Sequence, residues 1–171
     1  MKTAIALFCA ITLVACGAPG TGAGTDNTAD AGTTASAGNT IDLSQFDMPL
    51  LVNVPQNGHE PKAIMNDERG RAEVRAGEHF GLIVTEMAPD FARLKADLDR
   101  DMLVKNTITQ ETPDLIVYTS EFPDGTGTFT HFMQVVRSGG RTFVVEDLPD
   151  GRFNESDGRA MVAAVSAKPV S

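Results

Sequence analysis

The sequence predicts an α+β domain in which an antiparallel sheet carries two helices, one in the middle of the chain and one near its C-terminal end. Short runs of alternating apolar and polar residues recur through residues 41–171 and are separated by turn-forming residues. Two longer stretches instead space their apolar residues three or four positions apart, as amphipathic helices do. Consecutive strands joined by tight turns form antiparallel sheets, so we expect both helices to pack against one such sheet.

The first half of the domain is expected to contain a strand, a hairpin and a second strand. Residues 50–54 are apolar and end at Pro55, which predicts a strand. Residues 62–65 and 72–76 flank the turn sequence Asn-Asp-Glu-Arg-Gly and predict a hairpin. In the next predicted strand, residues 78–87, Phe80, Leu82 and Val84 share one face, whereas Ile83 and Met87 lie on the other.

The mid-chain helix is predicted within residues 88–104. Asp90 is a suitable N-cap, and a helical stripe is formed by Phe91, Leu94, Leu98 and Met102. Asp97, Asp99 and Asp101 alternate as in a calcium loop, but Met102 and Ile108 replace the glycine and glutamate that such a loop needs. We therefore expect a helical charge ladder, which would consist of Arg93, Asp97, Asp101 and Lys105.

The second half is predicted to form three strands and a C-terminal helix. The strands cover residues 114–120, 128–137 and 141–147, with glycine-rich turns between them. The helix covers residues 154–168, with an N-cap at Asn154 or Ser156 and a stop at Pro169. Over most of residues 48–168, this order of elements resembles the PsbP-like α/β/α sandwich. The resemblance rests on no motif, carries over no functional residue, and implies a non-catalytic accessory or binding protein.

The first residues have the features of an export signal. Lys2 precedes an apolar run, Ala4–Val14, which is shorter than the roughly 20 residues needed to span a bilayer. The run ends in Leu13-Val14-Ala15-Cys16, which resembles the lipobox of bacterial lipoproteins. The resemblance implies that residues 1–15 are a type II signal peptide and that Cys16 is lipidated and anchors the chain to a membrane. The alternatives are an ordinary secretory signal and an uncleaved anchor helix.

Residues 16–40 are expected to form the lipidated N-terminus and a disordered linker, because they are rich in Gly, Ala, Thr, Ser and Asp. Residues 41–171 are expected to form a single globular domain. Gly17 stands where inner-membrane lipoproteins of Gram-negative bacteria tend to have aspartate. The lipoprotein resemblance therefore implies a cell-envelope location, with the outer membrane facing the periplasm favoured in a Gram-negative host.

The composition argues against several classes of function. Residues 41–171 contain 13 Lys and Arg against 21 Asp and Glu, a formal charge of −8, which disfavours nucleic acid as a partner. The three histidines, His59, His79 and His131, lack metal-ligand spacing, and removal of Cys9 with the signal leaves Cys16 as the only cysteine. We therefore expect no cofactor, no metal site and no disulfide. A cation bound by the acidic loop 148–158 is the alternative to ordinary turn and N-cap chemistry there.

Two hypotheses of function remain from the sequence, together with a purely structural envelope lipoprotein, which the sequence does not separate from the first of them. The first is a membrane-anchored lipoprotein whose domain is a non-catalytic binding or accessory module for an envelope protein or a small ligand. The alternative is an envelope hydrolase that uses carboxylates and His131. The predicted strand places His131 on one face with Phe129, Met133 and Val135, which favours a partly buried structural histidine.

Overall fold

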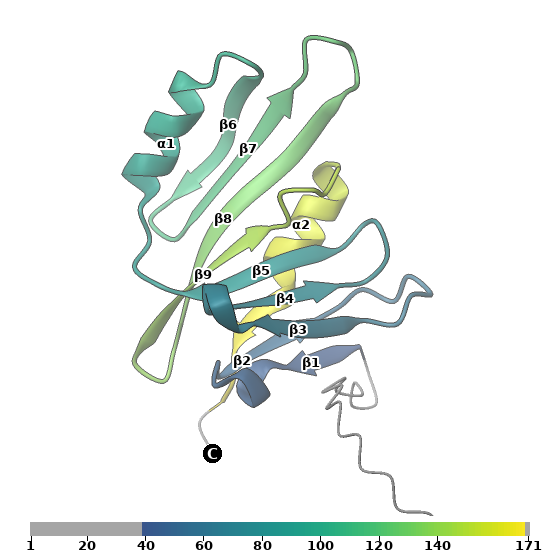
Figure 1. Ribbon diagram of the computed structural model, residues 1–171, viewed down its shortest axis with the longest axis vertical. Coiled ribbons are helices and arrows are strands. Elements are labelled where there is room, and N and C mark those ends of the chain that lie inside the picture. The colour runs from purple at the N-terminus through teal and green to yellow at the C-terminus, as the bar shows by residue number, and fades with distance from the viewer. Residues whose placement is uncertain (1–38, 170–171) are drawn as a thin grey trace, which may run out of the picture. The chain divides into compact units, whose positions relative to one another are not determined.

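The computed structural model describes residues 39–169 and confirms the α+β class (Figure 1). Its strands are β1 (Thr40–Asp42), β2 (Leu50–Asn53), β3 (Lys62–Asn66), β4 (Arg71–Arg75), β5 (Gly81–Glu86), β6 (Lys105–Thr112), β7 (Leu115–Glu121), β8 (Thr128–Ser138), β9 (Arg141–Asp147) and β10 (Val165–Ala167). The helices are α1 (Phe91–Arg100) and α2 (Glu155–Ala164). Short 3-10 turns cover Leu43–Phe46 and Asp67–Arg69.

Two antiparallel sheets make up the strand layers. The larger sheet has seven strands in the spatial order β3-β4-β5-β9-β8-β7-β6, and the smaller has the order β1-β2-β10. The pairing of β5 with β9 joins the hairpin built early in the chain to the later meander. The predicted hairpin 62–76 and the three late strands are confirmed.

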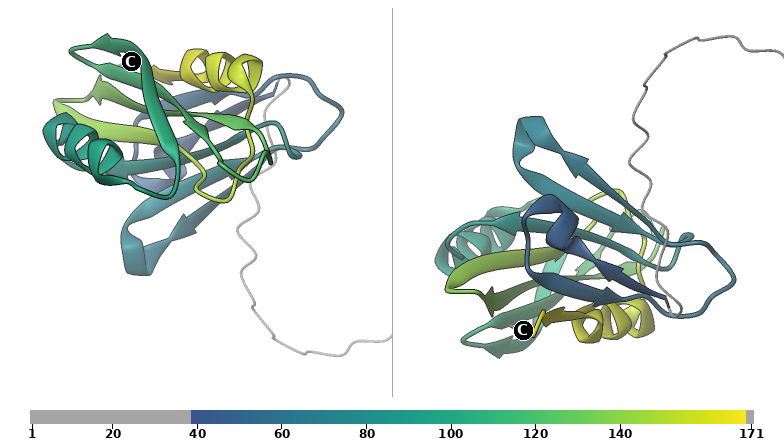
Figure 2. Two further views of the ribbon diagram at one scale, coloured as in Figure 1. Left: turned by 90° about the horizontal axis from the view of Figure 1, so that it is seen from above. Right: turned by 90° about the horizontal axis from the view of Figure 1, so that it is seen from below.

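The two helices lie on opposite sides of the seven-stranded sheet (Figure 2). We call the side that carries α2 and the three-stranded sheet the inner face, and the side that carries α1 the outer face. On the outer face, the Asn106 side chain accepts a hydrogen bond from Ser120 and donates one to the Leu98 carbonyl of α1. No helix within residues 39–169 is long and apolar enough to cross a membrane.

The core lies between the inner face and the elements that cover it. β2 contributes Leu50 and Val52, and both are fully buried. Phe80, Leu82 and Val84, which the sequence placed on one face of the strand 78–87, are all buried. Ile83 on the opposite face is buried as well, so β5 is enclosed on both sides. At the end of the β8–β9 hairpin, Gly139 and Gly140 have φ values of 60° and 77°, which a tight turn of this kind requires.

The prediction for the mid-chain helix was correct at its start and wrong at its end. Asp90 caps α1 by accepting the Arg93 backbone N–H. The helix ends at Arg100 because Asp101 adopts an extended backbone and its carboxylate accepts the Leu103 N–H. Met102 therefore leaves the apolar stripe and is exposed. The charge ladder shortens to the pair Arg93–Asp97, because Lys105 belongs to β6.

The predicted C-terminal helix, residues 154–168, is longer than the helix in the structure. Asn154 caps α2 in a capping box with Asp157, as expected, but the helix ends at Ala164 and residues 165–167 form β10. Val165 is buried and pairs with Val52 of the central strand β2. Burial and pairing of a β-branched residue thus outweigh the helical spacing of the sequence.

The sequence did not predict β6, which forms one edge of the seven-stranded sheet. Ile108 is its one large apolar residue, so the strand has no alternating pattern to detect. Its pairing with β7 shifts register between Ile108 and Gln110. Such a bulge is common in edge strands, where it limits pairing with other chains.

α2 packs closely against β8 at Gly158. A Cβ atom at this position would lie 2.7 Å from the Thr130 Cγ2 methyl, and both residues are buried. Thr130 is β-branched and sits within a paired strand, so its methyl has little freedom to move. Gly158 therefore sets the distance between α2 and the inner face.

We predict that Gly158→Ala destabilises the domain by about 1–2 kcal/mol, because the steric clash exceeds the roughly 1 kcal/mol that alanine gains over glycine in a helix. In a protein that carries Thr130→Ser, the same change should be neutral or stabilising, since serine lacks the methyl. Urea unfolding of the two single variants and the double variant measures this coupling. An equal cost of Gly158→Ala in both backgrounds would contradict the packing argument.

Candidate functional site

A groove of about 760 Å³ lies beside α2 on the inner face of the seven-stranded sheet. It exists because α2 covers β8 and leaves the inner faces of β6 and β7 open. Alternation along β7 points Leu115, Val117 and Thr119 into the groove. The opposite wall belongs to α2, which contributes Val162 and Ala163.

The groove combines an apolar floor with a rim of hydrogen-bonding groups. The apolar lining consists of Leu115, Val117, Val162 and Ala163, and the polar lining consists of Thr109, Gln110, Thr119, Thr128, Thr130 and Asn154. The charged residues of the lining are Glu155 and Arg159, which form an ion pair one helical turn apart. Apolar walls with a few oriented polar groups are typical of sites that bind small molecules or peptide segments.

His131 was the candidate base of the hydrolase hypothesis, and it is bound to Asp147. Its Nδ1 lies 2.8 Å from Asp147 Oδ2, while the other carboxylate oxygen accepts the Phe132 backbone N–H at 2.9 Å. The ladder between β8 and β9 ends at Met133–Glu146, so Asp147 satisfies a backbone group just beyond the pairing. The Tyr118 ring stacks on His131 with centroids 5.2 Å apart.

The surroundings of His131 supply no evident reaction partner. A cavity of about 170 Å³ beside it is lined by Phe122, Thr126, Phe129, His131, Pro149, Asp150, Gly151 and Arg152. The one hydroxyl in this lining belongs to Thr126 and donates to Asp124. Arg75 donates two hydrogen bonds to the Asp150 carboxylate, and both N–O distances are 3.3 Å. The His131–Asp147 pair therefore acts as a link between β8 and β9 in this geometry.

The pairing of His131 with Asp147 was not predicted, although the sequence contains a signal for it. A tight Gly139–Gly140 turn fixes Ser138 opposite Arg141, and this register places Asp147 opposite Phe132, next to His131. The groove had no comparable signal, because its shape depends on how much of the sheet α2 covers.

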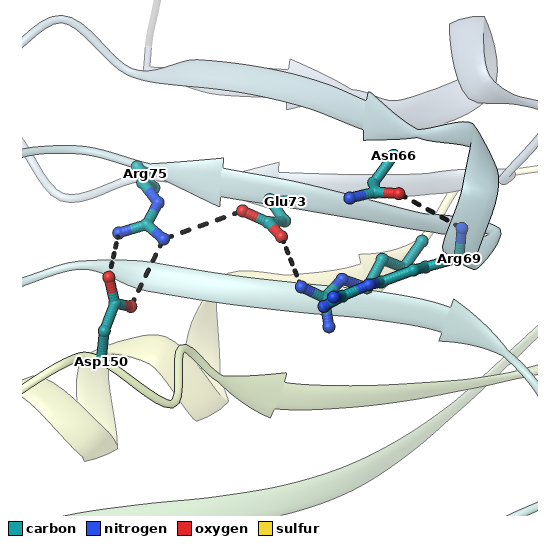
Figure 3. Close-up of polar contacts among 6 residues, drawn as sticks. Asn66, Arg69, Glu73, Arg75 and Asp150 are labelled. Carbon is teal, nitrogen blue, oxygen red and sulfur yellow. Dashed lines mark hydrogen bonds and ion pairs between the residues drawn. The ribbon is translucent and has the colours of Figure 1, made fainter.

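The outer face of β4 carries a chain of ion pairs (Figure 3). The Glu73 carboxylate lies 2.9 Å from Arg71 and 3.7 Å from Arg75, and Arg75 continues the chain to Asp150. These contacts attach the loop after β9 to β4. At the neighbouring turn, the Asn66 side chain accepts the Arg69 N–H at 3.2 Å.

The acidic loop 148–158 uses its oxygens within the protein. Asp150 binds Arg75, Asn154 caps α2, and Asp157 contacts His79 at 3.2 Å. Within residues 39–169, no group of three or more His, Cys, Asp or Glu side chains is placed to hold a metal ion. Asn154 caps α2 as the sequence predicted, whereas the ion pairs of Asp150 with Arg75 and of Asp157 with His79 were not predicted.

Burial shifts two further groups on the outer face. It raises the pKa of Tyr118, with the negative charges of Asp147 and Glu146 adding to the shift. Burial also raises the pKa of Glu146, Asp147 adds to that shift, and the positive charge of Arg71 opposes it. Both groups are therefore more easily protonated than in water.

The predicted lipidation site, Cys16, and the signal peptide lie outside the described residues and stay predictions. No protein-family model, curated protein or solved structure matches the chain.

We predict that Glu146→Gln stabilises the domain at neutral pH and that the gain disappears on acidification below about pH 4. Because the folded protein binds the Glu146 proton more tightly than the unfolded chain, the wild type loses stability as pH rises above the ordinary glutamate pKa of 4.5. Urea unfolding between pH 3.5 and 7.5 measures the difference. Glu60→Gln at an exposed position is the control, and an equal pH dependence in both variants would refute the assignment.

Proposed function

We propose that the protein is a bacterial envelope lipoprotein, anchored through Cys16, whose domain binds a ligand non-catalytically in the groove beside α2. The observation that supports this proposal most directly is the groove itself. Its floor is apolar, its rim is rich in hydroxyl groups, and its two charged side chains neutralise each other. Such a lining favours an uncharged ligand with an apolar body and a few polar groups, or an extended peptide segment of that character.

The alternative of an envelope hydrolase receives less support. A general base needs a substrate proton within hydrogen-bond reach and an open approach to it. His131 is mostly buried, its Nδ1 contacts Asp147, and the groove lies on the opposite face of the sheet. Two-carboxylate hydrolysis would need a free carboxylate pair around a cleft. In the groove, Glu155 is the one carboxylate, and it is bound to Arg159.

The groove is tested by a matched pair of substitutions, each at an exposed helical alanine. Ala163→Arg places a long charged side chain in the groove, whereas Ala92→Arg makes the same change on α1. Residues 39–169 are used once a melting experiment has shown that they unfold cooperatively. The probe is Nile red, an uncharged dye that fluoresces in apolar sites.

We predict that Ala163→Arg weakens Nile red binding at least about tenfold, while Ala92→Arg leaves it unchanged. The physical reason is that burying the new guanidinium against Leu115 and Val117 would cost more than the dye gains. Leu103→Ser serves as a second control, since Leu103 is an exposed apolar residue outside the groove. Equal binding by the wild type and Ala163→Arg would reject the groove as the site.

We predict that the native protein carries lipid on Cys16 and begins at that residue. Thioether formation needs a thiol, so Cys16→Ser should abolish both labelling with radioactive palmitate and cleavage of residues 1–15. Mass spectrometry of the N-terminal peptide checks both events. Cys9→Ser is the matched control and should be processed normally. An unmodified, soluble mature chain would reject the anchor and leave the groove proposal standing.

A further inference from the structure

Two neighbouring loops at one end of the seven-stranded sheet expose large apolar side chains. Met102 and Leu103, between α1 and β6, are 95% and 81% exposed, and Phe122, at the start of the β7–β8 turn, is 36% exposed. Together with Val104 and Pro123 they border a hollow of about 530 Å³. We call these five residues the apolar tip. A soluble surface seldom gathers apolar side chains in this way unless another molecule covers them.

Hydrogen bonds hold both loops in the conformation that exposes the tip. The Asp101 carboxylate accepts the Leu103 N–H at 2.9 Å, which fixes the chain between α1 and β6. In the other loop, Phe122 donates its N–H to the Gly127 carbonyl and accepts one from Gly125, each at 3.2 Å. Asp124 accepts two hydrogen bonds from Thr126. A surface fixed in advance loses little conformational entropy on binding.

Acidic residues predominate around the apolar tip. Four acids, Asp99, Asp101, Glu121 and Asp124, adjoin it in sequence, against two bases, Arg100 and Lys105. Lys105 is paired with Glu121 at 3.4 Å, and Arg100 is 4.0 Å from Asp97. Arg152 offsets part of the Asp124 charge, so the negative charges of Asp99 and Asp101 are the ones left to face the molecule that covers the tip.

This charge decides between the possible occupants. An anionic membrane surface would be repelled by the acidic margin and by the domain's formal charge of −8. A symmetric dimer would bring two acidic margins together. The first described strand, β1, lies at the end of the fold opposite the α1–β6 and β7–β8 loops (Figure 1). An anchor attached there does not by itself bring the tip to the bilayer.

We propose that the apolar tip docks an envelope protein that presents an apolar side chain surrounded by Lys and Arg. The proposal rests on the envelope location given under the proposed function, but it does not depend on the groove. The apolar centre would supply the affinity, and the charged margin would supply orientation and speed of association.

The experiment places a photo-crosslinking amino acid at position 103 of the full-length protein in its native envelope. Position 64 is the control, because Ile64 is 57% exposed on the other edge of the sheet. A protein adduct specific to position 103 is identified, and that protein is purified for binding measurements. We expect Met102→Ser and Leu103→Ser each to raise its Kd about tenfold, as truncation of a central contact does.

Two further variants separate the tip from the groove. Asp99→Lys combined with Glu121→Lys should weaken binding and reverse its dependence on salt, since the attraction at the margin becomes repulsion while the hydrogen bonds from Asp101 and Asp124 that hold the loops stay in place. Ala163→Arg should leave this partner's Kd unchanged, even where it weakens the binding of Nile red to the groove. Melting curves confirm that each exposed substitution leaves the fold intact.

Other results would overturn the docking proposal. Adducts of position 103 with phospholipid alone would make the tip a membrane contact, and adducts with a second copy of the chain would make it a dimer interface. The proposal would also be rejected if no specific adduct formed, or if Leu103→Ser left the partner's Kd unchanged. Failure of the proposed envelope location would be recognised separately, because the chain would then be found soluble and without lipid on Cys16.

Discussion

The pairing of β5 with β9 is the constraint on which the rest of the structure depends. It joins β3–β5 to β6–β9, two groups that would otherwise form separate small sheets. Isolated hairpins are marginally stable in water, whereas a strand buried on both faces contributes apolar surface to both sides of the sheet. β5 meets this condition, because Leu82 and Val84 face the inner core and Ile83 is buried on the outer face. The helix α1 and three strands separate β5 from β9 in sequence, so this pairing costs more loop-closure entropy than the hairpins do, and it is the pairing that joins the two groups.

A mismatch in size between the layers produces the candidate binding site. The seven-stranded sheet is wider than the elements that cover its inner face, namely the three-stranded sheet and α2. The cover ends over β8, where Gly158 allows α2 to approach Thr130 closely. Beyond that contact, β7 still points Leu115 and Val117 inward without a layer above them. The groove is thus the uncovered end of the core, which explains why its floor is apolar although it is open to solvent.

Sequence patterns predicted the elements whose stability is local and missed those that depend on distant partners. Alternation identified the strand that contains Leu82, and Asp90 and Asn154 marked helix starts, because pleating and capping act within a few residues. β6 was missed since it has a single large apolar residue, and its pairing with β7 alone defines it. Val165 was assigned to a helix because its helical spacing is local, whereas its pairing with Val52 spans most of the domain. The contact of His131 with Asp147 follows from the hairpin register that the Gly139–Gly140 turn fixes, whereas the groove depends on the layer order, which no local pattern contains.

The groove and the apolar tip would serve an anchored protein in different ways. The proposed anchor at Cys16 would confine the domain to a small volume next to the membrane. Confinement of this kind raises the effective concentration of a membrane-bound partner, and a modest docking surface then suffices for binding. The tip, with its few apolar side chains and acidic margin, has the size and charge of such a surface. Ligand binding in the groove would not be strengthened by a membrane-bound partner. It would be strengthened by a rigid wall, and the close contact between Gly158 and Thr130 holds α2 in place as that wall. A ligand in the groove would therefore depend on the packing of α2, whereas a partner at the tip would depend on the exposed apolar side chains and their acidic margin, so the two proposed binding events would respond to different substitutions.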